Sequence, residues 1–120
     1  VVDLIEDRAA PPARQSAGSV HHVAFAVPDR AAQDEVRRGI EEAGLRPTPS
    51  IDRDYFRAIY FRTPGGVLFE VATDEPGFAR DEAPEALGTA LRLPRQHAHL
   101  RPSLVGALEP LPGVAMEAAA

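Results

Sequence analysis

The chain has 120 residues, the length of one domain with a modest hydrophobic core. Its 18 acidic residues outnumber its 13 basic residues, all of them Arg, and the net charge of -5 argues against nucleic-acid binding. The absence of Cys excludes disulfides, thiolate metal sites and cysteine nucleophiles.

Membrane association is not expected either. No window approaches the roughly 20 apolar residues of a membrane-spanning helix, and the start of the sequence lacks the basic and apolar regions of a secretory signal. We therefore expect a protein of the cytoplasm.

The first 18 residues predict a short strand and a linker. Residues 1–6, with the sequence VVDLIE, are typical of a strand. Residues 7–18 are rich in Pro, Ala, Arg and Ser, as linkers are.

Residues 19–74 predict one β-α-β-β-β module. A strand over residues 19–27 is followed by Asp29, a good N-cap for a helix over residues 30–43. Gly44 supplies the signal that ends this helix. The helix carries apolar residues with the spacing of one buried stripe: Ala32, Val36, Ile40 and Ala43.

The second half of the module predicts extended chain. Strands are expected over residues 58–62 and 67–72, with a Thr-Pro-Gly-Gly turn over residues 63–66 between them. A small sheet of this kind carries a helix on one face only. Its other face should therefore be covered by a second module or a second copy of the chain.

A C-terminal tail with short helices is expected over residues 75–120. The helices are predicted over residues 81–90 and 99–108, and residues 111–120 should be frayed or disordered. The predicted organisation is thus a strand and linker over residues 1–18, an α+β module over residues 19–74, and the tail.

Two strands of the module each place one metal-binding side chain among apolar residues. Because side chains alternate along a strand, His22 shares a face with Ala24, and Glu70 shares a face with Leu68. If the bulky opposite faces pack on the helix, His22 and Glu70 project to the same side of the sheet. Each residue alone is typical of a structural role, but an ionised Glu is costly to bury without a cation, and the shared face favours a joint site.

Six segments carry a resemblance to a known family. They are HHVAF (21–25), DRDYF (52–56), AIYFR (58–62), GVLFEVATD (66–74), EPGF (75–78) and LRLP (91–94). With the β-α-β-β-β order, they resemble the vicinal-oxygen-chelate superfamily, which includes glyoxalase I, extradiol dioxygenases and bleomycin-resistance proteins. The likeness is greatest to ring-cleaving dioxygenases of the hydroquinone-tolerance type.

The resemblance implies a ring-cleaving dioxygenase, or the C-terminal part of one, acting on a catechol- or hydroquinone-like aromatic and O2. It implies that His22 and Glu70 are metal ligands, for Fe(II) first and for Mn, Zn or Ni as alternatives. Tyr60 lies ten residues before Glu70, where extradiol enzymes place an active-site Tyr that hydrogen-bonds the substrate. Of the other imidazoles, His21 is expected to pack or orient, and His97 and His99 are weaker candidates.

Two features depart from the resemblance. Extradiol enzymes carry a His shortly before this Tyr, where the chain has residues 51–53. Asp52, Asp54 or Tyr55 could replace it as acid or base. Relatives also carry several modules, and residues 1–6 resemble the last strand of a preceding one. We therefore expect a piece of a longer enzyme, or a module that forms a homodimer.

Two other functions stay open. Two copies related by a two-fold axis would offer two His and two Glu to one metal ion, a set similar to that of glyoxalase I, which would suit a lyase or isomerase. A non-catalytic small-molecule binder, as in bleomycin-resistance proteins, would need no metal ligands, so the presence of His22 and Glu70 argues against it.

Overall fold

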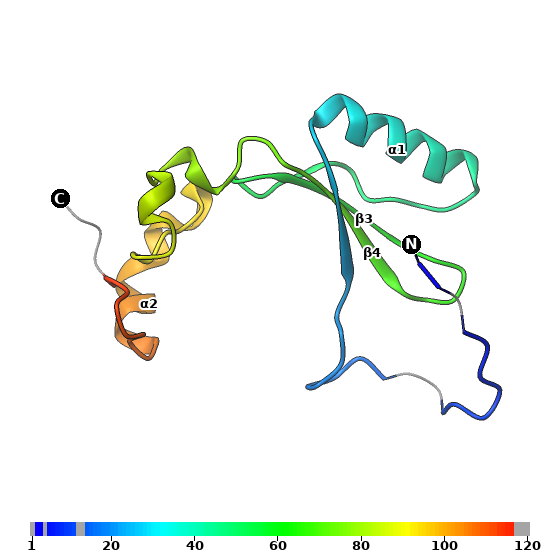
Figure 1. Ribbon diagram of the computed structural model, residues 1–120, viewed down its shortest axis with the longest axis horizontal. Helices are drawn as coiled ribbons and strands as arrows, with labels where there is room; N and C mark the ends of the chain where they lie inside the picture. Colours follow the sequence, from blue (N-terminus) through cyan, green and yellow to red (C-terminus); the bar gives the residue numbers. More distant parts are fainter. Residues whose placement is uncertain (1, 4, 12–13, 117–120) are drawn as a thin grey trace.

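The computed structural model describes residues 2–3, 5–11 and 14–116, and it confirms the predicted α+β module followed by a helical C-terminal segment (Figure 1). The module consists of β1 (Val23–Val27), α1 (Arg30–Glu42), β2 (Ile51–Asp52), β3 (Arg57–Arg62) and β4 (Leu68–Thr73). The C-terminal segment consists of the 3-10 helices η1 (Phe78–Arg80), η2 (Pro84–Ala86) and η3 (Arg95–Leu100) and the α-helix α2 (Arg101–Ala107).

The four strands form one mixed sheet in the order β1-β4-β3-β2. Strand β4 is parallel to β1 and antiparallel to β3, so the first and last strands of the module are neighbours. The register pairs Glu70 with Ala24 on one side and with Tyr60 on the other. Paired residues share a face of the sheet, so β1, β4 and β3 contribute side by side to the face that carries Glu70.

Helix α1 begins and ends as the sequence predicts. Asp29 Oδ1 accepts a hydrogen bond from the Ala32 N–H at 2.8 Å, which satisfies a donor that has no partner within the helix. At the other end Gly44 has a φ of 80°, a conformation that glycine adopts without steric cost.

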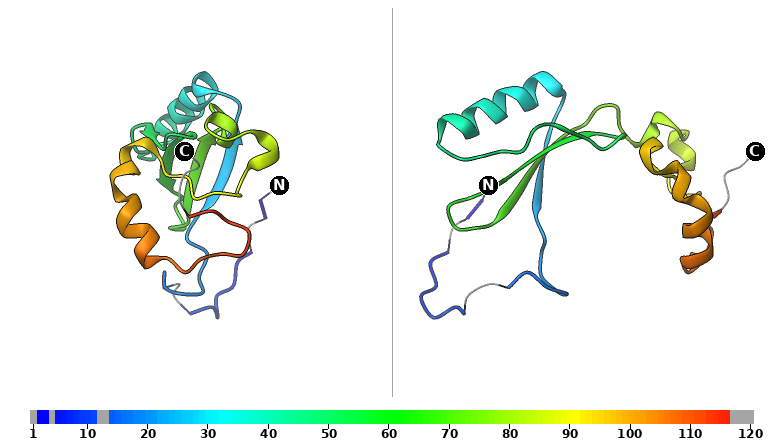
Figure 2. Two further views of the ribbon diagram at one scale, coloured as in Figure 1. Left: turned by 90° about the vertical axis from the view of Figure 1, so that its left-hand side faces the viewer. Right: turned by 180° about the vertical axis from the view of Figure 1, so that it is seen from behind.

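Helix α1 covers one face of the sheet (Figure 2). Ile40 packs there on Ile59 and Val71, and Ile59 has no exposed surface. Phe69 meets Phe25 and Phe61 edge to face, with ring centroids 5.1 and 5.7 Å away. The bulky faces of the strands thus point toward α1, as predicted, and the face with Glu70 points away from it.

The helix presents a polar residue to the sheet where only apolar residues were expected. Gln33 is fully buried, whereas Val36 of the predicted stripe is 38% exposed. Gln33 Nε2 donates to the carbonyl oxygens of Arg57 and Val71, both at 2.9 Å, and its Oε1 accepts from Ser50 Oγ at 2.7 Å. The first two bonds tie α1 to β3 and β4, and the third ties it to Ser50, directly before β2. Together they set the rotation of the helix on the sheet.

Replacing Gln33 by Leu should therefore lower the free energy of unfolding by about 2 kcal/mol or more, because each buried polar group left without a partner costs about 1–3 kcal/mol. Urea unfolding followed by circular dichroism measures this. The exposed Gln96 is the matched control, and Gln96→Leu should change the free energy by less than about 0.5 kcal/mol. Equal effects of the two substitutions would contradict the role given to Gln33.

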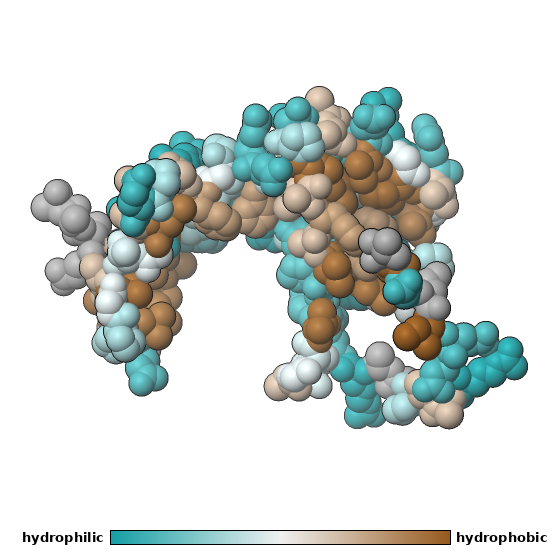
Figure 3. All heavy atoms as spheres, viewed as in Figure 1, coloured by the Kyte–Doolittle hydropathy of each residue, from teal (hydrophilic) through white to brown (hydrophobic). Residues whose placement is uncertain are grey.

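The described chain is open rather than compact. Its radius of gyration is 18.1 Å, whereas a compact domain of this length has about 14 Å. The C-terminal segment lies beyond one end of the sheet, and the space-filling view shows a hollow between the two parts (Figures 1 and 3). Among the described elements, α1 is the helix that packs on the sheet, so the predicted free face is present.

The N-terminal expectations are only partly met. The strand predicted over residues 1–6 is wrong for residues 2–3 and 5–6, which have no partner strand, while Val1 and Leu4 lie outside the described residues. The next strand starts later than predicted, because β1 pairs only with β4 and this pairing begins at Val23. His22 therefore directly precedes the strand.

The C-terminal expectations are also corrected. The helix predicted over residues 81–90 is wrong: Pro84 starts only one 3-10 turn, and Gly88 has a φ of 78°. The helix predicted over residues 99–108 is present in part, as α2.

The end of the chain is more ordered than expected up to residue 116. Ala115 forms a bridge with Ala90, its N–H donates to the Thr89 carbonyl at 2.8 Å, and its carbonyl accepts from the Leu91 N–H at 2.7 Å. Residues 117–120 lie outside the described residues. The division of the chain into residues 1–18, 19–74 and 75–120 stays a prediction.

Asp54 joins the C-terminal segment to the sheet. Its side chain is 2% exposed; Oδ2 accepts from Arg80 Nη2 at 2.8 Å and from the Arg95 N–H at 2.7 Å, and Oδ1 accepts from Arg95 Nε at 2.8 Å. Burial raises the pKa of Asp54, but the hydrogen bonds of Arg95 and the charges of Arg80 and Arg95 outweigh it and hold the pKa below its ordinary 3.8.

The attachment of the C-terminal segment should therefore depend on pH in acid. Because the pKa of Asp54 is lowered in the folded chain, its stabilising contribution is complete above pH 3.8 and is lost as the pH falls through the lower, folded-state value. The protection factors of residues 78–107 in hydrogen exchange, which correct for the intrinsic effect of pH on amide exchange, should fall in that range. Asp54→Asn should give fast exchange of these residues at neutral pH as well. Asp3→Asn, at an exposed position, should not. If neither acid nor Asp54→Asn changed the protection of residues 78–107, the proposed attachment would be contradicted.

Within residues 2–3, 5–11 and 14–116, no helix combines the length and the apolar composition that crossing a membrane requires.

Candidate metal centre

His22 and Glu70 lie against each other on the face of the sheet that α1 leaves free. The distance from His22 Nε2 to Glu70 Oε2 is 2.8 Å. The carboxylate is 6% exposed and the imidazole 36% exposed, so solvent reaches the pair from the side of His22. The two side chains converge as face parity predicts; that they bind a metal stays a proposal.

His21 contacts Nδ1 of His22, the ring nitrogen that faces away from Glu70. The Nδ1 atoms of His21 and His22 are 2.8 Å apart, and the two rings meet edge to face with centroids separated by 5.1 Å. One Nδ1 donates and the other accepts in such a contact. Metal-binding His residues commonly have a partner of this kind on the nitrogen remote from the metal, which agrees with an orienting role for His21.

Tyr60 reaches the pair from β3. Its ring centroid is 6.1 Å from that of His22, and its backbone is paired with Glu70 across the sheet. Burial raises the pKa of Tyr60; Arg53 acts to lower that pKa and Glu70 to raise it, and the net pKa lies above its ordinary value. The phenol therefore keeps its proton at neutral pH and can donate it in a hydrogen bond.

Arg53 lies beside this phenol. Its Nη2 donates to the Tyr60 hydroxyl at 3.3 Å, and the guanidinium carbon lies 5.6 Å from the ring centroid. The sequence identified this stretch only as the place where a His of the extradiol enzymes is missing. The structure puts a cation there.

The three proposed substitutes for that His are engaged elsewhere. Asp54 binds the C-terminal segment, Asp52 accepts from Arg57 Nη1 at 3.3 Å, and the Tyr55 hydroxyl donates to Asp81 at 2.9 Å. None of the three forms a hydrogen bond with Tyr60 in the described structure. This geometry gives no support to the prediction that one of the three acts as acid or base.

The remaining imidazoles do not complete a metal site. His97 and His99 lie in the exposed helix η3 of the C-terminal segment. Among the described residues, no group of three or more His, Asp or Glu side chains is placed to hold one metal ion.

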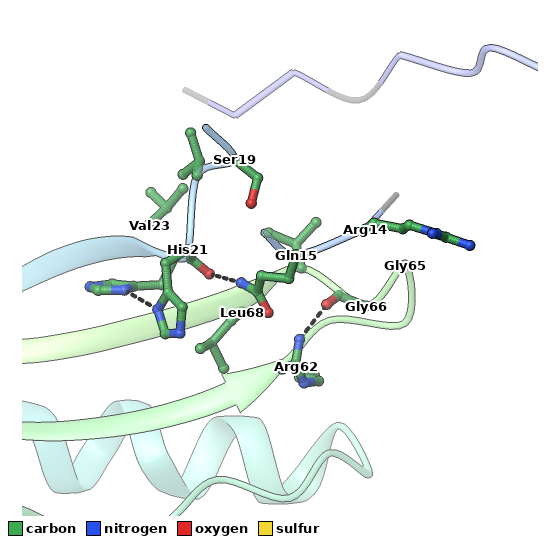
Figure 4. Close-up of a pocket in the computed structure, with 12 residues that line it drawn as sticks. Arg14, Gln15, Ser19, His21, Val23, Arg62, Gly65, Gly66 and Leu68 are labelled. Carbon is green, nitrogen blue, oxygen red and sulfur yellow. Dashed lines mark hydrogen bonds between the residues drawn. The ribbon is translucent and has the colours of Figure 1, made fainter. Parts of the chain in front are cut away.

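A cavity of about 570 Å³ opens beside His22 (Figure 4). One wall comes from the segment that leads into β1, and the other comes from the turn between β3 and β4. Its lining residues are Arg14, Gln15, Ser19, Val20, His21, His22, Val23, Arg62, Gly65, Gly66, Val67 and Leu68. The cavity thus reaches from the imidazole pair to the hairpin, with an apolar middle and Arg side chains at its rim.

The donor set fits part of a metal site. An imidazole nitrogen and a carboxylate oxygen are ligands that Fe, Mn, Zn and Ni share. Glu70 is buried with one ion-pair partner among the described residues, a state that a metal cation would stabilise. Catalytic sites generally use at least three protein ligands, however, and the described residues bring together two side chains of the kinds that could serve.

A β-α-β-β-β module with an imidazole and a carboxylate on its free face defines the class of metal-chelating modules that the sequence suggested. The chain belongs to the Glyoxalase/Bleomycin resistance protein/Dioxygenase superfamily, whose family model matches residues 1–71.

Three comparisons with known proteins agree with this membership. The chain is 42% identical over 110 residues to the "Putative ring-cleaving dioxygenase MhqA" of Bacillus subtilis (strain 168), covering 92% of this chain and 35% of that protein. It is 46% identical over 82 residues to the "Chlorohydroquinone/hydroquinone 1,2-dioxygenase" of Sphingobium indicum, covering 66% and 25%. A crystal structure titled "putative dioxygenase from Bacillus subtilis subsp. subtilis str. 168" superposes with a TM-score of 0.73 at 47% identity, covering 78% and 30%.

The chain spans about a third or less of the length of the curated relatives it matches. The predicted resemblance to the superfamily, and within it to ring-cleaving dioxygenases, is confirmed by these matches.

Sequence reasoning missed the cations around this face. Arg62 could have been found, because it stands at the end of a strand next to the predicted turn over residues 63–66. Arg14 and Arg53 carried no signal, since one lies in a linker and the other in an irregular loop whose path depends on the sheet.

Proposed function

We propose that the chain contributes to the active site of a metal-dependent ring-cleaving dioxygenase of the extradiol type, acting on hydroquinone- or catechol-like aromatics. The contact between His22 and Glu70 at 2.8 Å on the free face is the observation that carries this proposal. The names of the relatives, which include a chlorohydroquinone/hydroquinone 1,2-dioxygenase, support the substrate class. The cytoplasmic location expected from the composition stays a prediction.

In this proposal His22 Nε2 and the Glu70 carboxylate hold the metal, with Fe(II) preferred and Mn, Zn or Ni as alternatives. A metal held by these two residues would supply the one-electron chemistry that the reaction of an aromatic diol with O2 needs. The contact of His21 with His22 Nδ1 fixes the imidazole plane and aims Nε2 at Glu70.

Tyr60 orients the substrate and supplies a proton donor. Its oxygen accepts a hydrogen bond from Arg53, and its proton is directed at Glu70. A substrate oxygen bound beside Glu70 would accept the hydrogen bond of the phenol in place of the carboxylate. A phenol with a raised pKa stays protonated at neutral pH and can donate a hydrogen bond to an ionised substrate oxygen. That Asp52, Asp54 or Tyr55 accepts the substrate proton stays a prediction.

The rest of the site comes from another module or another copy of the chain. The described residues offer two ligands, and the face that carries them lacks a helical cover. Pairing with a second module, or formation of a homodimer, would supply the third ligand and close the face. A two-fold pairing of identical chains would create the glyoxalase-like set of two His and two Glu, and so this lyase or isomerase function is the second candidate.

Metal analysis and oxygen uptake separate these functions. The longest natural chain that contains these residues should be purified without oxygen, analysed for metal, and mixed with catechol and hydroquinone. Iron in the protein and consumption of O2 are expected. Bound metal without O2 consumption would favour the glyoxalase-type function. Absence of metal, together with unchanged behaviour of the protein in the His22→Ala and Glu70→Ala variants, would favour a binding module.

A further inference from the structure

The cavity beside His22 is positively charged although the chain is acidic. Arg14 and Arg62 line it together with the two imidazoles, and none of its lining residues is Asp or Glu. In the whole sequence acids outnumber bases by 18 to 13. An excess of cations in a cavity of an acidic protein marks a place where an anion is stabilised.

Neither guanidinium is neutralised by a carboxylate of the described chain. Arg62 makes one hydrogen bond, from Nη1 to the Gly66 carbonyl at 2.9 Å across the hairpin. A guanidinium has five N–H donors, so Arg62 is held in place by its partner and keeps donors for a ligand.

The wall that carries Arg14 is tied to the site as well. Gln15 Nε2 donates to the His21 carbonyl at 2.7 Å. Ser19 Oγ accepts from the Ser16 N–H at 2.9 Å and donates to the Ser16 carbonyl at 2.7 Å, which closes a turn. Figure 4 shows Arg62 beside Leu68 at the hairpin, whereas the Arg14 side chain extends away from the imidazoles at the outer rim.

We propose that this cavity gives the site a preference for aromatic substrates that carry an anionic substituent, such as a ring carboxylate. The ring lies along Leu68 with its hydroxyls toward His22, and Arg62 binds the anion at the far end, with Arg14 adding positive charge at the rim. This inference rests on the proposed function, whose substrate class it narrows.

A charge-assisted contact between Arg and a carboxylate is among the stronger hydrogen bonds, and it also fixes the orientation of the ligand. One such contact in a partly open cavity should contribute about tenfold in affinity. The preference should also weaken as salt is added, because exposed charges are screened.

The test is a binding measurement by calorimetry under nitrogen, with no metal added, on the longest natural chain. The probes are 2,5-dihydroxybenzoate and hydroquinone, which differ only by the carboxylate. The unmodified protein should bind 2,5-dihydroxybenzoate about tenfold more tightly than hydroquinone. Arg62→Gln combined with Arg14→Gln should bring the two affinities together, and Arg62→Lys should keep most of the preference.

Arg38→Gln is the matched control, because Arg38 is exposed on α1, on the other side of the sheet. It removes one positive charge and should leave the preference unchanged. Equal affinities of the unmodified protein for the two probes would overturn the inference, and so would a preference that survives loss of both cavity Arg residues in protein shown to be folded by circular dichroism.

Failure of the inference and failure of the proposed function give different results. Oxygen uptake without a preference for the carboxylate would overturn the inference and leave the dioxygenase proposal standing. A carboxylate preference without metal or oxygen uptake would keep the cavity as an anion-binding site and remove the dioxygenase.

Discussion

Glu70→Gln should weaken metal binding by at least about 100-fold. The substitution keeps the size of the side chain but replaces the charged carboxylate by a neutral amide, which is a weaker metal ligand. In the unmodified chain Glu70 Oε2 lies 2.8 Å from His22 Nε2. Loss of a residue that merely supports a ligand already costs about 10–100-fold, so loss of a ligand should cost more. Competition between the anaerobic protein and a coloured metal chelator measures the affinity.

The matched control is Glu75→Gln, because Glu75 is exposed and takes no part in the His22 pair. It should leave metal affinity within about twofold of the unmodified protein. Metal affinity that falls equally in both variants would mean that net charge, rather than Glu70, attracts the metal. Unchanged affinity in Glu70→Gln would remove Glu70 from the metal centre.

Ile59→Ala should lower the free energy of unfolding by about 2–5 kcal/mol. Ile59 is the largest fully buried apolar side chain, and it packs with Ile40 and Val71 between β3 and α1. Truncation removes apolar contacts and leaves a cavity that the open sheet can close only in part. Denaturant unfolding, followed by circular dichroism, gives the value.

Ile5→Ala provides the comparison for the same change of side chain, because Ile5 is 89% exposed. Its effect should stay within about 0.5 kcal/mol. A similar loss in both variants would show that the core is not where the structure puts it. A negligible loss in Ile59→Ala alone would show that the module is stabilised mainly by contacts with a partner.

The module could be predicted from sequence because its signals are local. Alternation within the strands fixed the face of His22 and Glu70, and Asp29 and Gly44 fixed the ends of α1 within a residue or so. The pairing of β1 with β4 joins the first and last strands of the module, and no local pattern predicted it. The contact at 2.8 Å between His22 and Glu70 depends on that pairing.

The rest failed where tertiary contacts override local patterns. Gln33 replaces Val36 at the sheet because buried carbonyls of β3 and β4 need a donor, which no helical periodicity reveals. Asp54 was a predicted candidate for an acid or base, but its carboxylate forms ion pairs with Arg80 and Arg95 of the C-terminal segment. In both cases a polar side chain is engaged by a partner distant in sequence.

The central claim is that His22 and Glu70 turn from each other to a shared metal ion. A crystal structure of the longest natural chain, grown without oxygen in the presence of Mn(II), measures this through anomalous scattering. A peak is expected at about 2.0–2.3 Å from both His22 Nε2 and a Glu70 carboxylate oxygen. A peak bound elsewhere, with the His22–Glu70 hydrogen bond intact, would contradict it.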